Sequence, residues 1–158
     1  MPKPQDPSML PITTPSADDD ASNAPYTALL GLAPLDAATL VARVTHGLAF
    51  DTIEHLSTSI ELPLTRIGEL VNIPRTTMQR RRKEGHLHPD ESDRLVRMAR
   101  IIDRALDLFA HDADAARRWL DTPRPALGGA TPLDFARTDP GAREVEDLIG
   151  RLEHGIPS

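Results

Sequence analysis

The chain has 158 residues, 39% of them hydrophobic, which is sufficient for one compact domain or two small ones that share a core. Its formal net charge is −6 at pH 7 and it contains no cysteine, so a disulfide framework and a thiolate metal site are excluded. No apolar run approaches the roughly 18 residues needed to span a bilayer, and the first residues lack the apolar stretch of a signal peptide, so we expect a cytoplasmic protein with no membrane partner.

Residues 1–27 are predicted to form a flexible arm. They hold six prolines and the acidic run Asp18, Asp19, Asp20, with little hydrophobic periodicity. Such a segment cannot bury enough apolar surface to offset the entropy lost on ordering.

Helical periodicity begins after the arm. Leu40, Val41 and Val44 fit one face of a predicted helix that Gly47 ends, and residues 50–56 are predicted to form a second short helix. Sustained alternation of apolar and polar residues, which would predict strands, is absent from the sequence. We therefore expect an all-α fold.

Two further helices are predicted across residues 63–83, with the features of a helix-turn-helix. Gly68 is small enough for the contact between the two helices, and Asn72 tolerates the positive φ that the turn requires. Pro74 can start the second helix. Arg81 falls where this motif often has an apolar residue, so we expect its stem to pack while its head reaches solvent, or the helix to be tilted. The apolar positions predicted to lock the crossing angle are Leu64, Ile67, Val71, Ile73 and Met78.

The second of these helices makes the middle of the chain basic. Residues 66–104 hold 10 Lys and Arg against 6 Asp and Glu, whereas the segments on either side are acidic. Because charges farther apart than about 10 Å are largely screened, the basic block can bind a polyanion by itself. A solvated helix face without a ligand is the alternative. For DNA we predict that Arg75, Thr76 and Gln79 read base edges and that Thr77, Arg80, Arg82 and Lys83 hold phosphates.

A long linking helix is predicted over residues 89–110, which completes a helical domain over residues 28–110. Pro89 suits its first turn, and Asp90 and Glu91 complement the helix dipole. A C-terminal domain over residues 111–158 is predicted to hold a short helix ending near Pro123, a restart capped by Thr131, and a last helix over residues 141–153. The long helix over residues 89–110 carries an apolar stripe at helical spacing, which we interpret as core or as a dimer seam. Its residues are Leu95, Met98, Ala99, Ile102, Ala105, Leu106 and Phe109.

The segment "RRWLDTPRPALGGATPLDFARTDPGAREVEDLIGRLEHG", residues 117–155, resembles the toxin-binding domain of the Xre/MbcA/ParS antitoxins. That family has the pattern W-L-x-x-P-x-x-A-L-G-G-x-T-P-L-D, then T-x-x-G and an apolar helix. Residues 48–85 resemble its helix-turn-helix, and "HPDESDRLVRMARI" resembles its linking helix. The departures are Arg124, where Asn is common, and His88, where a capping Ser is common.

This resemblance implies an antitoxin that inhibits a RES-domain toxin, an enzyme that consumes NAD or transfers its ADP-ribose part. It further implies a homodimer, a higher hetero-oligomer with the toxin, repression of its own operon, and occlusion of the toxin's active site by the antitoxin's C-terminal end. We interpret most of the matched motif as fold determinants. The residues predicted to contact the toxin are Arg151, Glu153, His154, Gly155, Ile156, Pro157 and Ser158.

Two alternative functions are a stand-alone transcriptional regulator and an enzyme. A stand-alone helix-turn-helix regulator would use its C-terminal half only to dimerise. An enzyme is disfavoured because the sequence has no Gly-rich phosphate loop, no zinc-binding His pair on a helix and no nucleophile elbow. His86 and His88 offer only two metal ligands in a loop. We therefore predict no catalytic, cofactor-binding or metal-binding residues.

Overall fold

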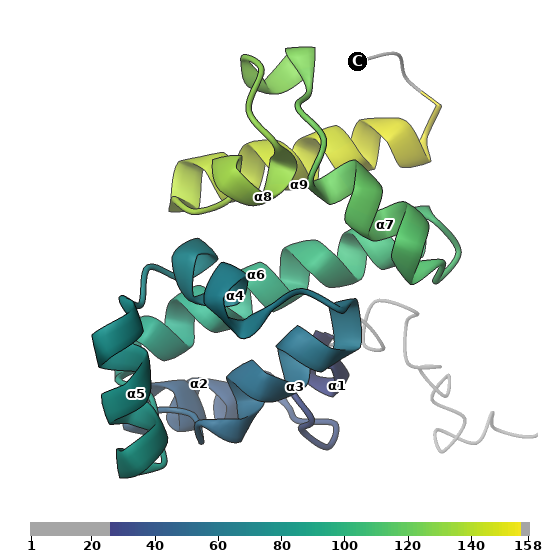
Figure 1. Ribbon diagram of the computed structural model, residues 1–158. Helices are drawn as coiled ribbons and strands as arrows, with labels where there is room; N and C mark the ends of the chain where they lie inside the picture. The colour runs from purple at the N-terminus through teal and green to yellow at the C-terminus, as the bar shows by residue number, and fades with distance from the viewer. Residues whose placement is uncertain (1–25, 156–158) are drawn as a thin grey trace, which may run out of the picture.

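The computed structural model describes residues 26–155. Most of the predicted arm therefore lies outside the described residues, and its last two positions, Tyr26 and Thr27, form the first turn of a helix. Every regular element of residues 26–155 is a helix, which confirms the predicted all-α fold (Figure 1). The elements are α1 (Tyr26–Leu29), α2 (Ala37–His46), α3 (Asp51–Ile60), α4 (Leu64–Leu70), α5 (Arg75–Glu84), α6 (Pro89–Leu108), α7 (Ala113–Leu120), the 3-10 helix η2 (Pro125–Leu127), α8 (Pro132–Phe135) and α9 (Asp139–Glu153).

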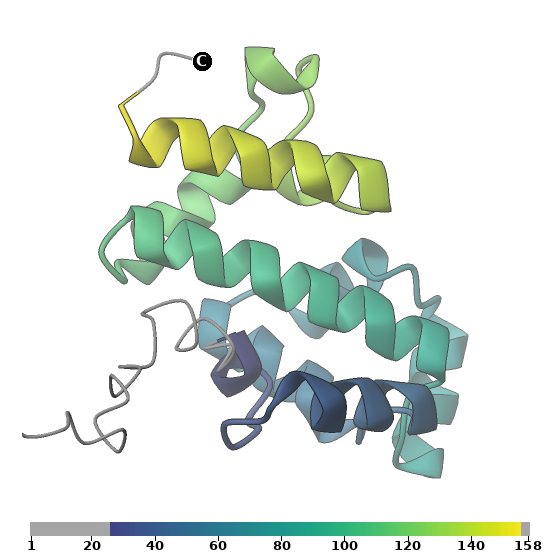
Figure 2. The ribbon, with the colours of Figure 1, turned by 180° about the vertical axis from the view of Figure 1, so that it is seen from behind.

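Helix α6 is the centre of the fold. Figure 2 shows α6 between α2 on one side and α9 on the other, and α6 also packs against α1, α3 and α7. Its predicted stripe is buried from Leu95 to Leu106, with Phe109 partly buried at its end. The stripe is therefore core within one chain, and each fully buried Leu or Ile in it contributes about 1.5–3 kcal/mol.

Helix α2 shows how the apolar pattern divides. Leu40 is buried and Val44 is half-buried, but Val41 is 64% exposed. Residues four apart share a helix face, whereas the residue after Leu40 lies about 100° around the axis. The prediction that Val41 shares the buried face is wrong for this reason.

Helices α4 and α5 form the predicted helix-turn-helix. Asn72 has a φ of +55°, as the turn requires. A Cβ on Gly68 would stand 3.0 Å from Met78 Cε and 3.2 Å from the Ile73 carbonyl oxygen, so a small residue is needed at this contact. Ile67 and Val71 are buried beside them, and Leu64 is half-buried. The predicted lock between the two helices is confirmed.

The C-terminal helices α7 and α9 pack against α6, and α8 packs against α7 and α9. The hydroxyl of Thr131 accepts a hydrogen bond from the amide of Asp134 at 3.1 Å, which confirms the predicted cap. Helix α9 begins at Asp139, two residues earlier than predicted, because Thr138 caps it by accepting from the amide of Gly141 at 3.1 Å. The matched motif is largely buried, as its interpretation as fold determinants requires: Trp119, Leu120, Leu127 and Leu133.

Within residues 26–155, none of the helices combines the length and the hydropathy of a membrane span.

Candidate nucleic-acid interface and C-terminal partner surface

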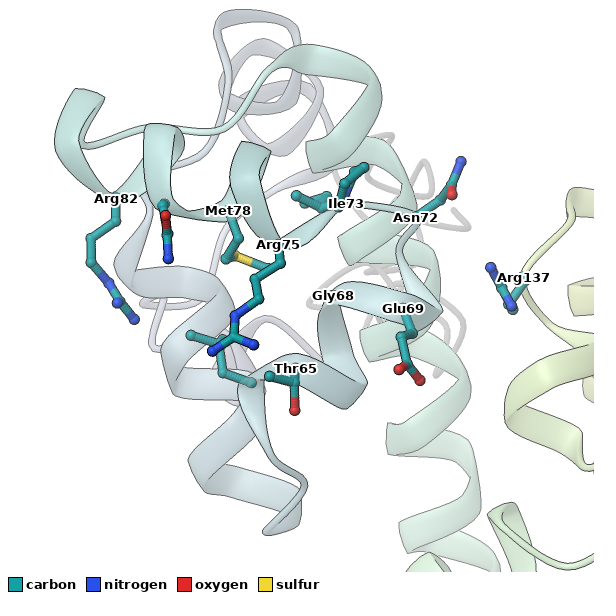
Figure 3. Close-up of a pocket in the computed structure, with 12 residues that line it drawn as sticks. Thr65, Gly68, Glu69, Asn72, Ile73, Arg75, Met78, Arg82 and Arg137 are labelled. Atoms are coloured by element: carbon teal, nitrogen blue, oxygen red, sulfur yellow. The ribbon is translucent and has the colours of Figure 1, made fainter.

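An open groove of about 690 Å³ lies on the outer face of the helix-turn-helix (Figure 3). Helix α4 and the turn contribute Thr65, Glu69 and Asn72 to its polar lining. Helix α5 contributes Arg75, Gln79 and Arg82. The groove therefore brings three of the residues predicted to contact DNA to one concave surface.

The other predicted DNA contacts lie on α5 outside this groove. Thr76, Arg80 and Lys83 are exposed, and Thr77 is half-buried. Within residues 26–155, neither Arg80 nor Lys83 forms an ion pair with another side chain. Their charges are therefore available to an external anion, as phosphate contacts require.

Arg82 has a more fixed position than the other cations of α5. Its guanidinium forms an ion pair with Glu54 at 3.6 Å and lies over the ring of Phe50, 5.4 Å from its centroid. Both partners belong to the segment around α3. The contacts orient Arg82 at the end of the groove while its side chain stays accessible to solvent.

Arg81 does not follow the expectation that its head reaches solvent. The residue is 5% exposed, and its Nε and Nη2 donate to the two carboxylate oxygens of Glu91 at 2.8 and 2.9 Å. Nη2 also lies 3.0 Å from His88 Nδ1, and Nη1 donates to Glu84 at 3.2 Å. The expected snorkelling is wrong because a carboxylate on α6 meets the guanidinium inside the protein. The hydrogen bond with Glu91 raises the pKa of Arg81.

Further polar contacts fasten the helix-turn-helix to α6. Arg94 Nε donates to the carbonyl of Val71 at 2.7 Å, next to the turn. The backbone amide of His88 donates to the Glu91 carboxylate at 2.9 Å, so the Glu91 side chain also caps the start of α6. Burial raises the pKa of Glu91, but the hydrogen bonds from Arg81 and His88 outweigh it, and the pKa is lowered. The helix-turn-helix is therefore held against α6 by buried and half-buried charged groups.

Arg66 connects α4 with the C-terminal half of the chain. It forms ion pairs with Asp121 at 3.3 Å, with Asp134 at 3.2 Å and with Glu69 at 3.4 Å. Burial lowers the pKa of Arg66, but Asp134 and Asp121 outweigh it and raise the pKa above its ordinary value. Sequence reasoning missed this residue, since two of its partners are 55 and 68 residues away.

The residues predicted to contact the toxin are only partly described. Glu153 forms an ion pair with Arg104 at 3.2 Å, and His154 Nδ1 lies 2.9 Å from the carbonyl of Gly150. Arg151 is half-buried and, within the described part of the chain, has no ion-pair partner. Gly155 follows with a φ of +68°. The remaining predictions, Ile156, Pro157 and Ser158, lie outside the described residues.

A small pocket of about 150 Å³ lies beside the last turns of α9. It is lined by Trp119, Arg124, Leu148 and Leu152, among others. Figure 1 shows the loop that carries η2 above the middle of α9. The guanidinium of Arg124 lies 5.2 Å from the centroid of the Trp119 ring, and its Nη2 donates to the Trp119 carbonyl at 3.4 Å. The departure at Arg124 is thus accommodated by stacking on the indole.

The two histidines considered as metal ligands have other neighbours. His88 Nδ1 lies 3.0 Å from Arg81, and His86 Nδ1 lies 3.2 Å from the Glu84 carbonyl. Among residues 26–155, no group of three or more His, Asp or Glu side chains is arranged to hold a metal ion.

Both halves of the chain match domain families of antitoxins. Residues 39–100 match the antitoxin Xre-like helix-turn-helix domain, and residues 104–155 match the antitoxin Xre/MbcA/ParS C-terminal toxin-binding domain. An antitoxin Xre of Yersinia enterocolitica is 38% identical over 128 residues, covering 80% of this chain and 86% of the relative.

Two other relatives share less of the sequence or less of the length. An antitoxin Xre of Photorhabdus laumondii is 45% identical over 75 residues, 48% of this chain and 51% of the relative. The Prs ADP-ribosylating antitoxin of a Sphingobium species is 20% identical over 139 residues, 82% of this chain and 86% of the relative. The chain therefore belongs to the Xre family of antitoxins, with a helix-turn-helix domain followed by a C-terminal toxin-binding domain.

Proposed function

We propose that this antitoxin neutralises a RES-domain toxin that consumes NAD or transfers ADP-ribose, by inserting its C-terminal end into the toxin's active site. We further propose that it represses its own operon through α4 and α5 and has no catalytic activity of its own. One observation carries the proposal. Helix α6 connects the helix-turn-helix, whose helix α5 exposes several cations, to a domain that matches a toxin-binding family.

The DNA side of the proposal is supported by the surface of α5. Arg75 and Gln79 lie in the groove near the N-terminal end of the helix, from which recognition helices reach base edges. Arg80 and Lys83 offer unpaired cations beside them for phosphates. A homodimer would present two such helices to an inverted repeat with half-sites about one helical turn apart.

The toxin side is supported by the way α9 is held. Arg100 pairs with Glu146 and Arg104 pairs with Glu153, so α9 is fixed along α6 to its last turn. Arg151 lies in that turn with its charge unpaired among the described residues. A guanidinium there can pair with the carboxylates of an NAD-cleaving site. The Sphingobium relative is named as an ADP-ribosylating antitoxin, which connects a similar protein with ADP-ribosylation.

Co-expression with the toxin encoded beside the antitoxin gene tests this mechanism. We expect Arg151→Ala, or deletion of residues 153–158, to abolish rescue of growth while operator binding is retained. Arg143→Ala is the matched control, because Arg143 is an exposed arginine near the opposite end of the same helix. Rescue by the Arg151→Ala and truncated proteins at the level of the control would overturn the proposed insertion.

Size-exclusion chromatography with light scattering tests the proposed assembly. We expect the antitoxin alone to elute as a homodimer and the co-expressed proteins as a larger hetero-oligomer. If the antitoxin is recovered with its operator but never with the neighbouring protein, the chain acts as a stand-alone regulator instead.

A further inference from the structure

We propose that Arg137, which lies inside the matched toxin-binding domain, is a DNA contact that extends the interface of the helix-turn-helix. One duplex would then touch both halves of the chain, with Arg137 holding a backbone phosphate beside the bases read by α5. This inference rests on the proposed DNA binding by α4 and α5.

Arg137 borders the same groove as the predicted base-reading residues. Figure 3 shows it across from Asn72 and Glu69, on the side formed by the C-terminal half of the chain. Arg75 and Gln79 line the opposite part of the groove. The side chain of Arg137 is exposed and, within residues 26–155, makes no ion pair or hydrogen bond through its guanidinium.

The position of Arg137 beside α4 is set by the ion pair of Arg66 with Asp134. Asp134 is three residues before Arg137, and its carbonyl accepts from the amide of Arg137 at 3.4 Å. Arg66 Nη1 binds the Asp134 carboxylate at 3.2 Å, and the buried Ala136 anchors the same turn. Asp134 therefore connects the backbone that carries Arg137 directly to the helix-turn-helix.

The charges around the groove favour an anion. Its cations are Arg75, Arg137 and Arg82, the last of which pairs with Glu54 at 3.6 Å. Its carboxylate, Glu69, pairs with Arg66 at 3.4 Å. The groove is open, and the exposed Arg80 adds a cation on another face of α5, outside the groove. Separated cations fit the repeated phosphates of a nucleic acid strand better than a single small anion, which needs converging donors.

The DNA and the toxin would contact opposite ends of α9. Arg137 lies two residues before α9 begins, whereas Arg151 lies in its last turn. At a rise of 1.5 Å per residue, the 12 steps from Asp139 to Arg151 span about 18 Å. Arg137 and the proposed toxin contact are therefore separated along the length of α9.

Fluorescence anisotropy with a duplex carrying the chain's own promoter region, titrated over a range of KCl concentrations, tests the inference. We expect Arg137→Ala to weaken binding about threefold to tenfold near 0.1 M salt and to reduce the slope of log K against log salt by about 0.9, the value for one phosphate contact. Arg118→Ala, which removes an exposed arginine of the same domain away from the groove, should leave both quantities unchanged.

The inference alone would be overturned if Arg137→Ala leaves the slope of log K against log salt unchanged, while the wild-type slope is steep and Arg80→Ala reduces it. A wild-type protein that binds the duplex without salt dependence would instead overturn the proposed DNA binding. The two failures are therefore distinguishable in one set of titrations.

A double-mutant cycle tests the role of Arg66 in positioning. If the ion pair with Asp134 holds Arg137 in place, Arg137→Ala should cost clearly less affinity in an Arg66→Ala background than in the wild type. Circular dichroism and retained capture of the toxin verify that the Arg66→Ala protein is folded. An equal cost in both backgrounds would overturn the positioning by Arg66.

Discussion

Arg81 on the recognition helix and Glu91 on the central helix form a two-pronged ion pair inside the protein, with N–O distances of 2.8 and 2.9 Å. Neither side chain reaches solvent to a significant extent, since their exposed fractions are 6% and 7%. The pair joins α5 to the first turn of α6. Its geometry therefore connects the core of the fold to the surface proposed to read DNA.

Removing one partner of this pair should destabilise the protein strongly. Glu91→Ala leaves the buried guanidinium of Arg81 without its carboxylate, and we expect the free energy of unfolding to fall by about 3–5 kcal/mol. Urea denaturation followed by circular dichroism measures the change. Arg80→Ala, at the exposed neighbouring position, should stay within about 0.5 kcal/mol of the wild type. A loss no larger than that in Glu91→Ala would show that the pair contributes little.

The same pair should make the stability depend on acid pH. Burial raises the pKa of Glu91, yet its hydrogen bonds from Arg81 and His88 lower it below the ordinary value of 4.5. A carboxylate with a lowered folded pKa stabilises the protein above its unfolded pKa, and this stabilisation is lost as the pH falls through the folded value. We expect the melting temperature to drop below about pH 4.5. Glu91→Gln should show a flatter profile in that range, and a profile as steep as the wild type's would contradict the assignment.

Asp103 should have the opposite effect from Glu91 on the pH dependence of stability. Burial, and then the negative charge of Asp107, raise the pKa of Asp103 above its ordinary value. An acid with a raised folded pKa weakens the fold above that value, and the penalty disappears as the pH falls below the unfolded one. Asp103→Asn should therefore raise the melting temperature slightly at pH 7, with the difference vanishing below about pH 4. A melting temperature below that of the wild type at pH 7 would contradict this.

Local sequence rules predicted the elements and the apolar contact between α4 and α5, but not the polar contacts between more distant elements. The positive φ at Asn72 follows from the residue preferences of a helix-turn-helix turn, and the structure shows it at +55°. The burial of the Arg81 head could not be predicted, because it depends on Glu91 meeting it from the next helix. Arg66 and Arg137 were missed for the same reason. Their significance lies in neighbours that helical periodicity does not reveal.

Different mutations on α5 should affect base reading and phosphate binding. Gln79 lies in the groove, so Gln79→Ala should lose about 1–3 kcal/mol of discrimination at one base step while non-specific affinity changes little. Arg80 lies outside it, so Arg80→Ala should weaken binding to all sequences similarly. Anisotropy titrations with the operator, single-step variants of it and an unrelated duplex measure both effects. Equal losses of specificity in the two variants would show that the roles are not divided in this way.

Two glycines of α9 provide a matched pair for testing how the toxin-binding end is supported. A Cβ on Gly141 would stand 1.8 Å from the carbonyl oxygen of Phe135, a backbone atom that cannot move without displacing the end of α8. The amide of Gly141 also donates to the Thr138 cap, so the start of α9 is held at this residue. At Gly150 the nearest atom to an added Cβ is the Arg104 Nη2, at 3.8 Å, which is ordinary contact.

Gly141→Ala should therefore destabilise the protein by about 1–3 kcal/mol or more through overpacking against backbone. Gly150→Ala, in the interior of the same helix, should stabilise it by about 0.5–1 kcal/mol because alanine loses less entropy than glycine in a helix. Urea denaturation measures both values, and co-expression with the toxin reports the effect on neutralisation. Since Gly141 lies between Arg137 and the rest of α9, its variant should weaken DNA binding and toxin capture together. Equal stability of the two variants would mean that α8 and α9 do not meet as closely as the Phe135 contact requires.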